Sequence, residues 1–166
     1  MHIERYITDH LDPDSYIECS FFDIVDVLDS HKFYSSGSNG IFELRSILTR
    51  LKTTTNRHRL NLGFEVWNSS ALDIDDLFET RNGDADEILA TVAWKALEFL
   101  LMNPETEIFT SGSTSARTRL YQIGIARNMD YLPENLRIEG IELQKKSGWV
   151  EFQKGINYDA FLLSVK

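Results

Sequence analysis

The sequence is poor in cysteine and histidine and has no long apolar run. Cys19 is the only cysteine in 166 residues, so no disulfide can form within the chain and a buried thiol is expected. The histidines lack the close spacing of a structural zinc site, so neither a metal nor any other cofactor is predicted; they are His2, His10, His31 and His58. No run approaches the roughly 18–20 apolar residues of a membrane helix, and the first residues lack the order of a signal peptide. We therefore expect a cytoplasmic protein that does not contact a membrane.

Basic residues are scarce relative to acidic ones. Lys and Arg number 17 against 26 Asp and Glu, which gives a formal net charge of −9 and repels polyanions at long range. The acids concentrate in residues 9–29 and 73–87, whereas every charged residue in 45–59 is basic. This distribution disfavours nucleic acid and suits a basic protein partner, and it leaves the oligomeric state undetermined.

The overall composition predicts one folded domain. Apolar residues make up 42% and charged residues 26% of the chain, as in ordinary globular proteins and unlike disordered ones. Residues 31–166 are predicted to form a single α+β domain. Residues 1–30 mix strand-like residues with irregularly spaced aspartates, so we interpret them as an N-terminal extension that packs on the domain and assign them no secondary structure.

Three strands are predicted in the first half of the domain. Residues 31–36 read as a strand, a turn follows at Gly37 to Gly40, and residues 41–48 form a second strand of alternating pattern. A third strand covers residues 59–67 and places one apolar row against a core; the row is Leu60, Leu62, Phe64 and Val66.

Two main helices are predicted, each followed by strands. The first has Asp84 as its cap, Glu87 as the partner in a capping box, and Pro104 beyond its end. A short strand at 106–111 precedes the second helix, which begins near Thr114, and three strands follow Pro133. The predicted order is βββ-α-β-α-βββ, a single layered domain with a mixed or antiparallel sheet and its helices on one face or one on each.

The segment FTSGSTSARTRLYQIGI, residues 109–125, predicts an anion-binding loop. A strand that enters a small-residue loop and then a helix aims unpaired backbone N–H groups and the positive helix end at one point. The predicted site comprises Ser111, Gly112, Ser113, Thr114, Arg117, Arg119 and Tyr121. Arg119 projects roughly 160° from Arg117 on a helix of 3.6 residues per turn, so the two cannot hold one small ligand together. The alternative interpretation is structural, with Ser or Thr as cap, glycine as turn former and arginine in a salt bridge.

Other constellations give weaker predictions. The acids of residues 73–86 could surround a divalent cation, but they do not fit an EF-hand and favour a solvated, helix-stabilising role; they are Asp73, Asp75, Asp76, Glu79, Asp84 and Asp86. A two-metal nuclease site is excluded because the first predicted strand has no acid and the fourth has only Glu107. Single-stranded nucleic-acid binding is a third possibility, through Arg45, Arg50, Lys52, Arg57 and Arg59.

Five segments together resemble an uncharacterised family of small bacterial proteins of the Bacteroidetes type. They are FYSSGSNGIFELRSI, LNLGFE, NGDADEILATVA, GSTSARTRLYQIGI and FQKGINYDAFLLSV. The resemblance spans about residues 31–164 and leaves residues 1–30 outside. It implies a cytosolic, single-domain bacterial protein and a shared role for Ser113, Thr114, Arg117 and Arg119, structural or functional, but no activity.

No catalytic residue is assigned from the sequence. The leading hypothesis is a non-catalytic binding or regulatory module, such as one half of a toxin–antitoxin or immunity pair, that presents an acidic surface to a basic protein. The alternative is an enzyme or sensor for a phosphorylated small molecule or nucleotide. In that case loop 111–114 would hold the phosphate, Arg117 would neutralise it, and Tyr121 would stack on the ligand or donate a hydrogen bond.

Overall fold

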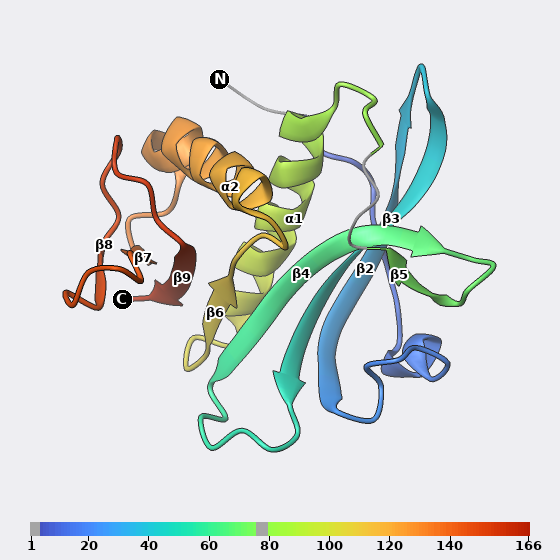
Figure 1. The fold of residues 1–166 in the computed structure, drawn as a ribbon, viewed down its shortest axis with the longest axis horizontal. Helices are drawn as coiled ribbons and strands as arrows, with labels where there is room; N and C mark the ends of the chain where they lie inside the picture. Colours follow the sequence, from blue (N-terminus) through green and yellow to red (C-terminus); the bar gives the residue numbers. More distant parts are fainter. Residues whose placement is uncertain (1–3, 76–79) are drawn as a thin grey trace.

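The computed structural model describes residues 4–75 and 80–166 of the chain and has an α+β fold (Figure 1). Its strands are β1 (Asp9–His10), β2 (Val25–Gly37), β3 (Gly40–Leu51), β4 (Arg59–Asn68), β5 (Asp73–Asp75), β6 (Glu107–Thr110), β7 (Leu136–Ile141), β8 (Trp149–Glu151) and β9 (Ala160–Val165). Its helices are α1 (Ala85–Met102), α2 (Ser115–Asn128) and the short 3₁₀ turns η1 (Pro13–Tyr16) and η2 (Met129–Tyr131). No helix in the described part of the chain is long and apolar enough to cross a membrane.

All nine described strands belong to one mixed sheet. The order is β1-β2-β3-β4-β6-β9-β7-β8, with β5 paired to β4 beside this path. The β4–β6 pair is parallel and the other pairs are antiparallel. The β2–β3 hairpin closes where Gly37 pairs with Gly40, whose φ of 114° suits glycine. The predicted α+β class and mixed sheet are confirmed, but the predicted element order lacks β1 and β5.

Strand β2 begins at Val25, six residues before the predicted strand. The aspartates of this segment interrupt the apolar pattern, so the sequence does not indicate a strand there. In the sheet they meet basic partners: Asp26 lies opposite Arg50, and Asp29 bonds His31 at 3.1 Å. Opposite charges across a strand pair are tolerated on a half-exposed face, so this part of the strand needs no continuous apolar row.

The two faces of the sheet are covered by different layers, and β3 contributes side chains to the packing on both faces. Leu44 and Leu48 point to α1, where they pack with Val92 and Leu100 among others. The intervening Ile47 faces the opposite side, as the period-two geometry of a strand requires. The predicted β4 row also packs on the helix side: Leu62, Phe64 and Val66 join these clusters, and Leu60 is buried.

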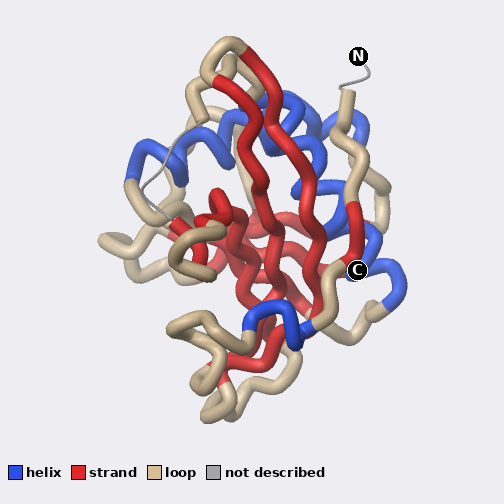
Figure 2. Tube along the Cα trace, turned by 90° about the vertical axis from the view of Figure 1, so that its right-hand side faces the viewer, coloured by secondary structure: helices blue, strands red, loops and turns tan. Residues whose placement is uncertain are grey.

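On the opposite face, η1 and the chain that follows it cover the long strands. Figure 2 shows η1 in front of the strands and both α-helices behind them. Tyr16 is fully buried there and packs with Cys19, Val27 and Ile47. Burial, with a contribution from the Asp73 carboxylate, raises the pKa of the Cys19 thiol to about 11. The thiol is therefore protonated at neutral pH, and Cys19 acts as a small core residue.

Helix α2 packs on the C-terminal strands and lies beside α1 (Figure 1). Tyr121 enters a cluster of buried residues that also contains Ile138, Phe152, Tyr158 and Phe161. Gly140 lets the Tyr158 ring approach β7, since a Cβ at Gly140 would lie 2.4 Å from that ring. This packing fixes α2 next to β4 and α1, where the candidate site lies.

Candidate functional site

The predicted anion loop is bonded to the first turn of its own helix. The Gly112 N–H donates to Thr118 Oγ1 at 2.9 Å, and the Thr114 hydroxyl accepts the Arg117 N–H at 3.2 Å. A Cβ at Gly112 would lie 2.4 Å from the Thr118 nitrogen, so glycine is needed for this close approach. Ser111 and Ser113 are exposed. Thr114 thus acts as the N-cap of α2, in agreement with the structural interpretation of this segment, in which Ser or Thr caps the helix.

Arg117 and Arg119 of α2 diverge, as the helical wheel predicts. Arg117 Nη1 lies 2.6 Å from Glu65 Oε2 on β4, with side-chain exposures of 15% and 12%. Arg119 instead donates to Asn157 Oδ1 at 2.8 Å on the surface. The Arg117 charge is therefore compensated by a carboxylate of the same chain. These contacts give the segment a structural role, and anion binding by residues 111–117 stays a prediction.

A groove opens between β4, α1, α2 and residues 80–83. We call it the helix groove; its volume is about 330 Å³ and its walls include Phe64, Glu65, Asp84, Leu89, Arg117 and Tyr121. The volume is at the lower end of ligand sites, and apolar walls with a few polar groups are typical of them. Of the residues predicted for the anion site, only Arg117 and Tyr121 line the groove.

Asp84 is the most buried charge of the helix groove, with 8% of the residue exposed. Its Oδ2 accepts hydrogen bonds from the Tyr6 hydroxyl and from Ser35 Oγ, each at 2.5 Å. Within the described residues, Oδ1 has no hydrogen-bond partner and no cation pairs with the carboxylate. Oδ1 is not one of the fully buried side-chain atoms that lack a hydrogen-bond partner in the described chain, so it is accessible. Because Asp84 lines the groove, we infer that Oδ1 faces it.

The predicted capping box at the start of α1 is wrong. Asp84 occupies the N-cap position, but its side chain accepts no hydrogen bond from the helix backbone. Its ψ of 27° differs from the extended backbone that usually turns an N-cap side chain toward the helix amides. Two tertiary hydroxyl donors take the place of those amides, and this contact could not be read from local spacing.

The tip of the β2–β3 hairpin positions Asp84. Asn39 donates its backbone N–H to Asn82 Oδ1 at 3.0 Å and its side-chain amide to the Arg81 carbonyl at 2.8 Å. Asn82 in turn donates to Ser35 Oγ at 3.1 Å, and a Cβ at Gly37 would lie 2.7 Å from the Asn82 side chain. Arg81 has a φ of 52°, unusual for a residue other than glycine. The hairpin therefore holds a strained loop against the groove.

Tyr121 contributes a second polar group to the groove. Its ring packs on Phe64 with centroids 5.3 Å apart, and 9% of the residue is exposed. Burial, with a further contribution from the Glu65 carboxylate, raises the pKa of Tyr121 to about 12. Its hydroxyl has no hydrogen-bond partner within the described part of the chain. The hydroxyl is neutral at physiological pH and able to donate or accept one bond.

Four of the five segments that carry the family resemblance meet at the helix groove. The first supplies Ser35 and the hairpin tip, and the second supplies Phe64 and Glu65. The third supplies Asp84, and the fourth supplies Arg117 and Tyr121. Segments that are distant in sequence therefore build one groove, although the sequence predicts a site only in the fourth.

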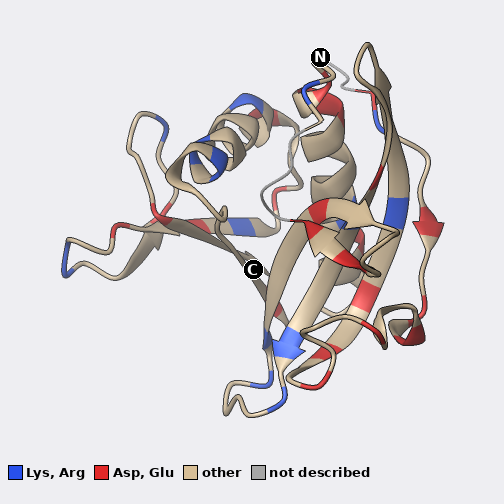
Figure 3. Cartoon of the chain, turned by 45° about the vertical axis from the view of Figure 1, so that its right-hand side comes forward, with Lys and Arg blue, Asp and Glu red and all other residues tan. Residues whose placement is uncertain are grey.

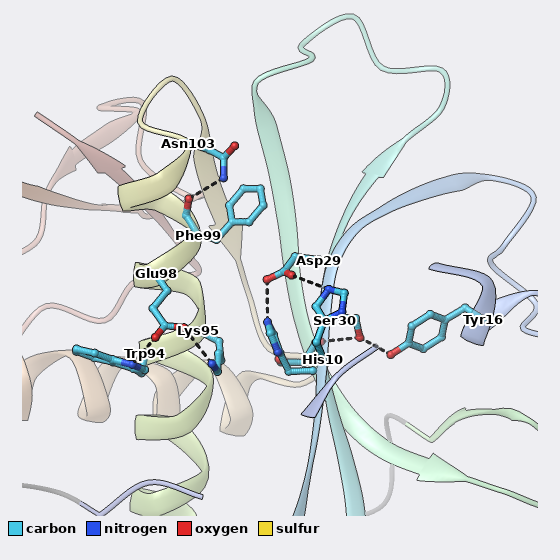
Figure 4. Close-up of polar contacts among 11 residues, drawn as sticks. His10, Tyr16, Asp29, Ser30, Trp94, Lys95, Glu98, Phe99 and Asn103 are labelled. Carbon is cyan, nitrogen blue, oxygen red and sulfur yellow. Dashed lines mark hydrogen bonds and ion pairs between the residues drawn. The ribbon is translucent and has the colours of Figure 1, made fainter. Parts of the chain in front are cut away.

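A second hollow, of about 420 Å³, lies between the N-terminal segment and α1. Arg5 stacks over Trp94 with its guanidinium 4.0 Å from the ring centroid. Trp94 Nε1 and Lys95 Nζ both donate to Glu98, at 2.9 and 3.0 Å (Figure 4). Glu4 and Arg5, which also line this hollow, are exposed, so water solvates their charges, whereas the Asp84 carboxylate of the helix groove is buried.

Two of the histidines that seem scattered in the sequence converge on one aspartate. Asp29 lies 3.1 Å from His31 Nε2 and 3.7 Å from His10 Nε2, and the two rings meet edge to face (Figure 4). The β1–β2 pairing, which places His10 opposite His31, creates this contact. No group of three or more potential ligands in the described chain is arranged to hold a metal ion.

The predicted acidic constellation is dispersed where it is described. Asp73 accepts from Ser20 Oγ at 2.9 Å, and Asp86 lies 3.2 Å from Arg127 Nη1. Asp76 and Glu79 lie outside the described residues. The described acids are therefore held by different parts of the fold.

Arg45 lies apart from the other basic residues proposed for nucleic-acid binding. Arg45 is buried on the η1 side, 3.6 Å from the Trp67 ring centroid, and bonds Glu43 at 2.8 Å. Near the β3–β4 connection, Arg50 approaches Asp26 at 3.8 Å and Arg59 approaches Glu107 at 2.7 Å. Figure 3 shows basic and acidic segments close together at this end of the long strands. Acids from neighbouring strands thus balance a stretch that has no acid of its own.

The chain belongs to DUF6934, a family of unknown function, whose model matches residues 21–166. This confirms the expectation of an uncharacterised family, and the match begins within the segment that the resemblance leaves out. No curated protein and no solved structure matches the chain.

Proposed function

We propose that this DUF6934 protein is a binding module that recognises a group of a partner protein in the helix groove. The observation that carries the proposal is unused hydrogen-bond capacity at two buried side chains of a largely apolar recess. Asp84 and Tyr121 are each more than nine-tenths buried, and each has a polar atom without a partner in the described chain. Buried polar groups are normally paired, so such atoms mark a place where a ligand completes the bonding.

The rigidity of the groove also supports binding. One wall is fixed by the Glu65–Arg117 ion pair and another by the hairpin contacts of Asn39 and Asn82. A recess that is already formed loses little conformational entropy when it is filled, which favours affinity. The ion pair also occupies the Arg117 guanidinium, so the groove has less positive charge available to bind a phosphate than the sequence predicts.

A groove-filling variant tests this function. Ala85 is exposed and lines the groove, so Ala85→Phe fills the recess from its edge. Ala71 is also exposed and lies in the β4–β5 connection, so Ala71→Phe adds the same ring elsewhere. Ligand-observed NMR with a library of small polar-apolar fragments should give ligands that bind the wild type and Ala71→Phe but not Ala85→Phe. Fragment binding unchanged by Ala85→Phe would contradict the proposal.

A further inference from the structure

The charge balance of the helix groove identifies the kind of group it takes. Glu65 and Arg117 compensate each other at 2.6 Å, and Arg81, which also lines the groove, is itself engaged. Asp84 forms no ion pair within the described residues. Its two donors are the uncharged hydroxyls of Tyr6 and Ser35. The buried carboxylate therefore lacks a counter-charge, which makes a cation the most favourable ligand.

The shape and the surroundings of the carboxylate constrain the cation further. Phe64, Leu89 and Leu120 give the groove an apolar wall beside its polar groups. A bare metal ion leaves such a wall uncovered, whereas an alkyl chain that ends in a guanidinium or ammonium group covers it. Tyr121, which lines the same groove, adds a neutral hydroxyl that can accept a hydrogen bond from a cationic head group. The chain's net charge of −9 also attracts cationic partners at long range.

We propose that the helix groove binds an arginine or lysine side chain of a basic partner protein, with the cationic head on Asp84 Oδ1 and the aliphatic stem against Phe64 and Leu120. This inference rests on the proposed function and names the partner's chemistry. Free alkylamines and alkylguanidines share this chemistry, so the test separates them from a side chain carried by a peptide.

The test compares two capped glycine peptides that differ in one group: one carries arginine and the other citrulline, its uncharged urea isostere. Calorimetric titration should give at least tenfold tighter binding of the arginine peptide to the wild type. Asp84→Asn keeps an oxygen that can accept from Tyr6 and Ser35 but removes the charge, and should bring the ratio close to one. Asp86→Asn, which removes an equal charge two residues away on the surface, should leave the ratio unchanged.

A second pair of variants leaves Asp84 intact, in case its replacement prevents folding. Leu120 is 45% exposed at the groove, so Leu120→Lys places a competing ammonium there while Leu120→Gln adds a neutral chain. We expect arginine-peptide affinity at least fivefold lower in Leu120→Lys than in Leu120→Gln. Equal affinities in this pair would overturn the inference.

The remaining outcomes separate the inference from the function on which it rests. If both peptides bind equally and Ala85→Phe abolishes both, the groove is a binding site but does not recognise a cation. If n-butylguanidinium binds and the arginine peptide does not, a free small molecule replaces the partner side chain. If neither peptide, nor n-butylguanidinium, nor any fragment binds in the groove, both proposals fail.

Discussion

The two main helices begin in similar sequence contexts but use their first polar residue in opposite ways. Thr114 precedes α2 with an extended backbone, ψ 161°, and its hydroxyl accepts the Arg117 N–H. Asp84 precedes α1 with ψ 27° and makes no such bond, and its carboxylate instead faces Tyr6 and Ser35. A cap residue can thus be released for another role when tertiary donors replace the helix amides.

The difference distinguishes a purely structural helix start, at α2, from a candidate binding site, at α1. At α2 the Thr114 cap, the Gly112 turn and the Arg117 side chain each have a bonding partner within the chain. At α1 a buried carboxylate retains an unused oxygen in a groove. Substitutions at these residues should affect stability to different degrees, with the largest effect at Asp84 and the smallest at Thr114.

Asp84→Ala should lower the free energy of unfolding by about 3–4 kcal/mol, because two hydrogen bonds to a buried carboxylate are lost and both hydroxyls remain without that acceptor. Chemical denaturation measures the change. Hydrogen exchange should also accelerate around Tyr6, whose hydroxyl Asp84 holds. A loss of only about 1 kcal/mol with unchanged exchange would make Asp84 an ordinary cap.

Glu65→Leu should cost about 3 kcal/mol, because it removes the carboxylate partner of a largely buried arginine. The double variant Glu65→Leu with Arg117→Met should recover most of that loss, since neither charge is then buried. Thermal and denaturant unfolding of the single and double variants measures the coupling. If the two single losses simply add in the double variant, the pair has no structural role.

Tyr121 should make the fold sensitive to alkali. Its pKa is about 12 in the folded chain, against the ordinary value of 10.0, so the unfolded chain releases this proton first as pH rises. The stabilisation is present in full below pH 10 and is lost between about pH 10 and 12, a loss of about 2–3 kcal/mol. Tyr121→Phe should flatten this part of the stability profile. An unchanged slope, or a tyrosine that titrates normally by ultraviolet absorbance, would contradict the assignment.

Thr114→Ala should cost about 1 kcal/mol by loss of a helix cap, while Thr114→Ser should stay close to the wild type. The comparison with Asp84→Ala shows directly which of the two residues acts only on its own helix. A Thr114→Ala loss as large as that of Asp84→Ala would remove the contrast between the two helix starts.

Local patterns predict much of the framework, because the spacing of apolar residues identifies strands and helices and glycine or proline marks where they end. The alternating row of β4, the glycine turn of the hairpin and the end of α1 before Pro104 all agree with the structure. The first part of β2 could not be predicted because its aspartates are compensated by His31 of the same strand and by Arg50 of β3. Strands β1 and β5 span only two and three residues, too short for a periodic signal.

The site was harder to predict than the framework because, as at the start of β2, it depends on contacts that local sequence patterns do not show. The sequence shows that the start of α2 is unusual, and Arg117 and Tyr121 do line the groove. It does not show that Glu65 compensates Arg117, or that Ser35 and Tyr6 draw Asp84 away from its helix. Those contacts join residues far apart in the chain, so only the fold identifies which polar groups keep unused bonds.

The most direct test of the account is a chemical-shift map of ¹⁵N-labelled protein titrated separately with n-butylguanidinium and with inorganic phosphate. The account predicts that n-butylguanidinium shifts the amides of residues 82–89 and 117–121, and that phosphate leaves residues 111–114 unchanged. Shifts at residues 111–114 on addition of phosphate, with no response of the groove to the guanidinium, would contradict it and return the site to the loop before α2.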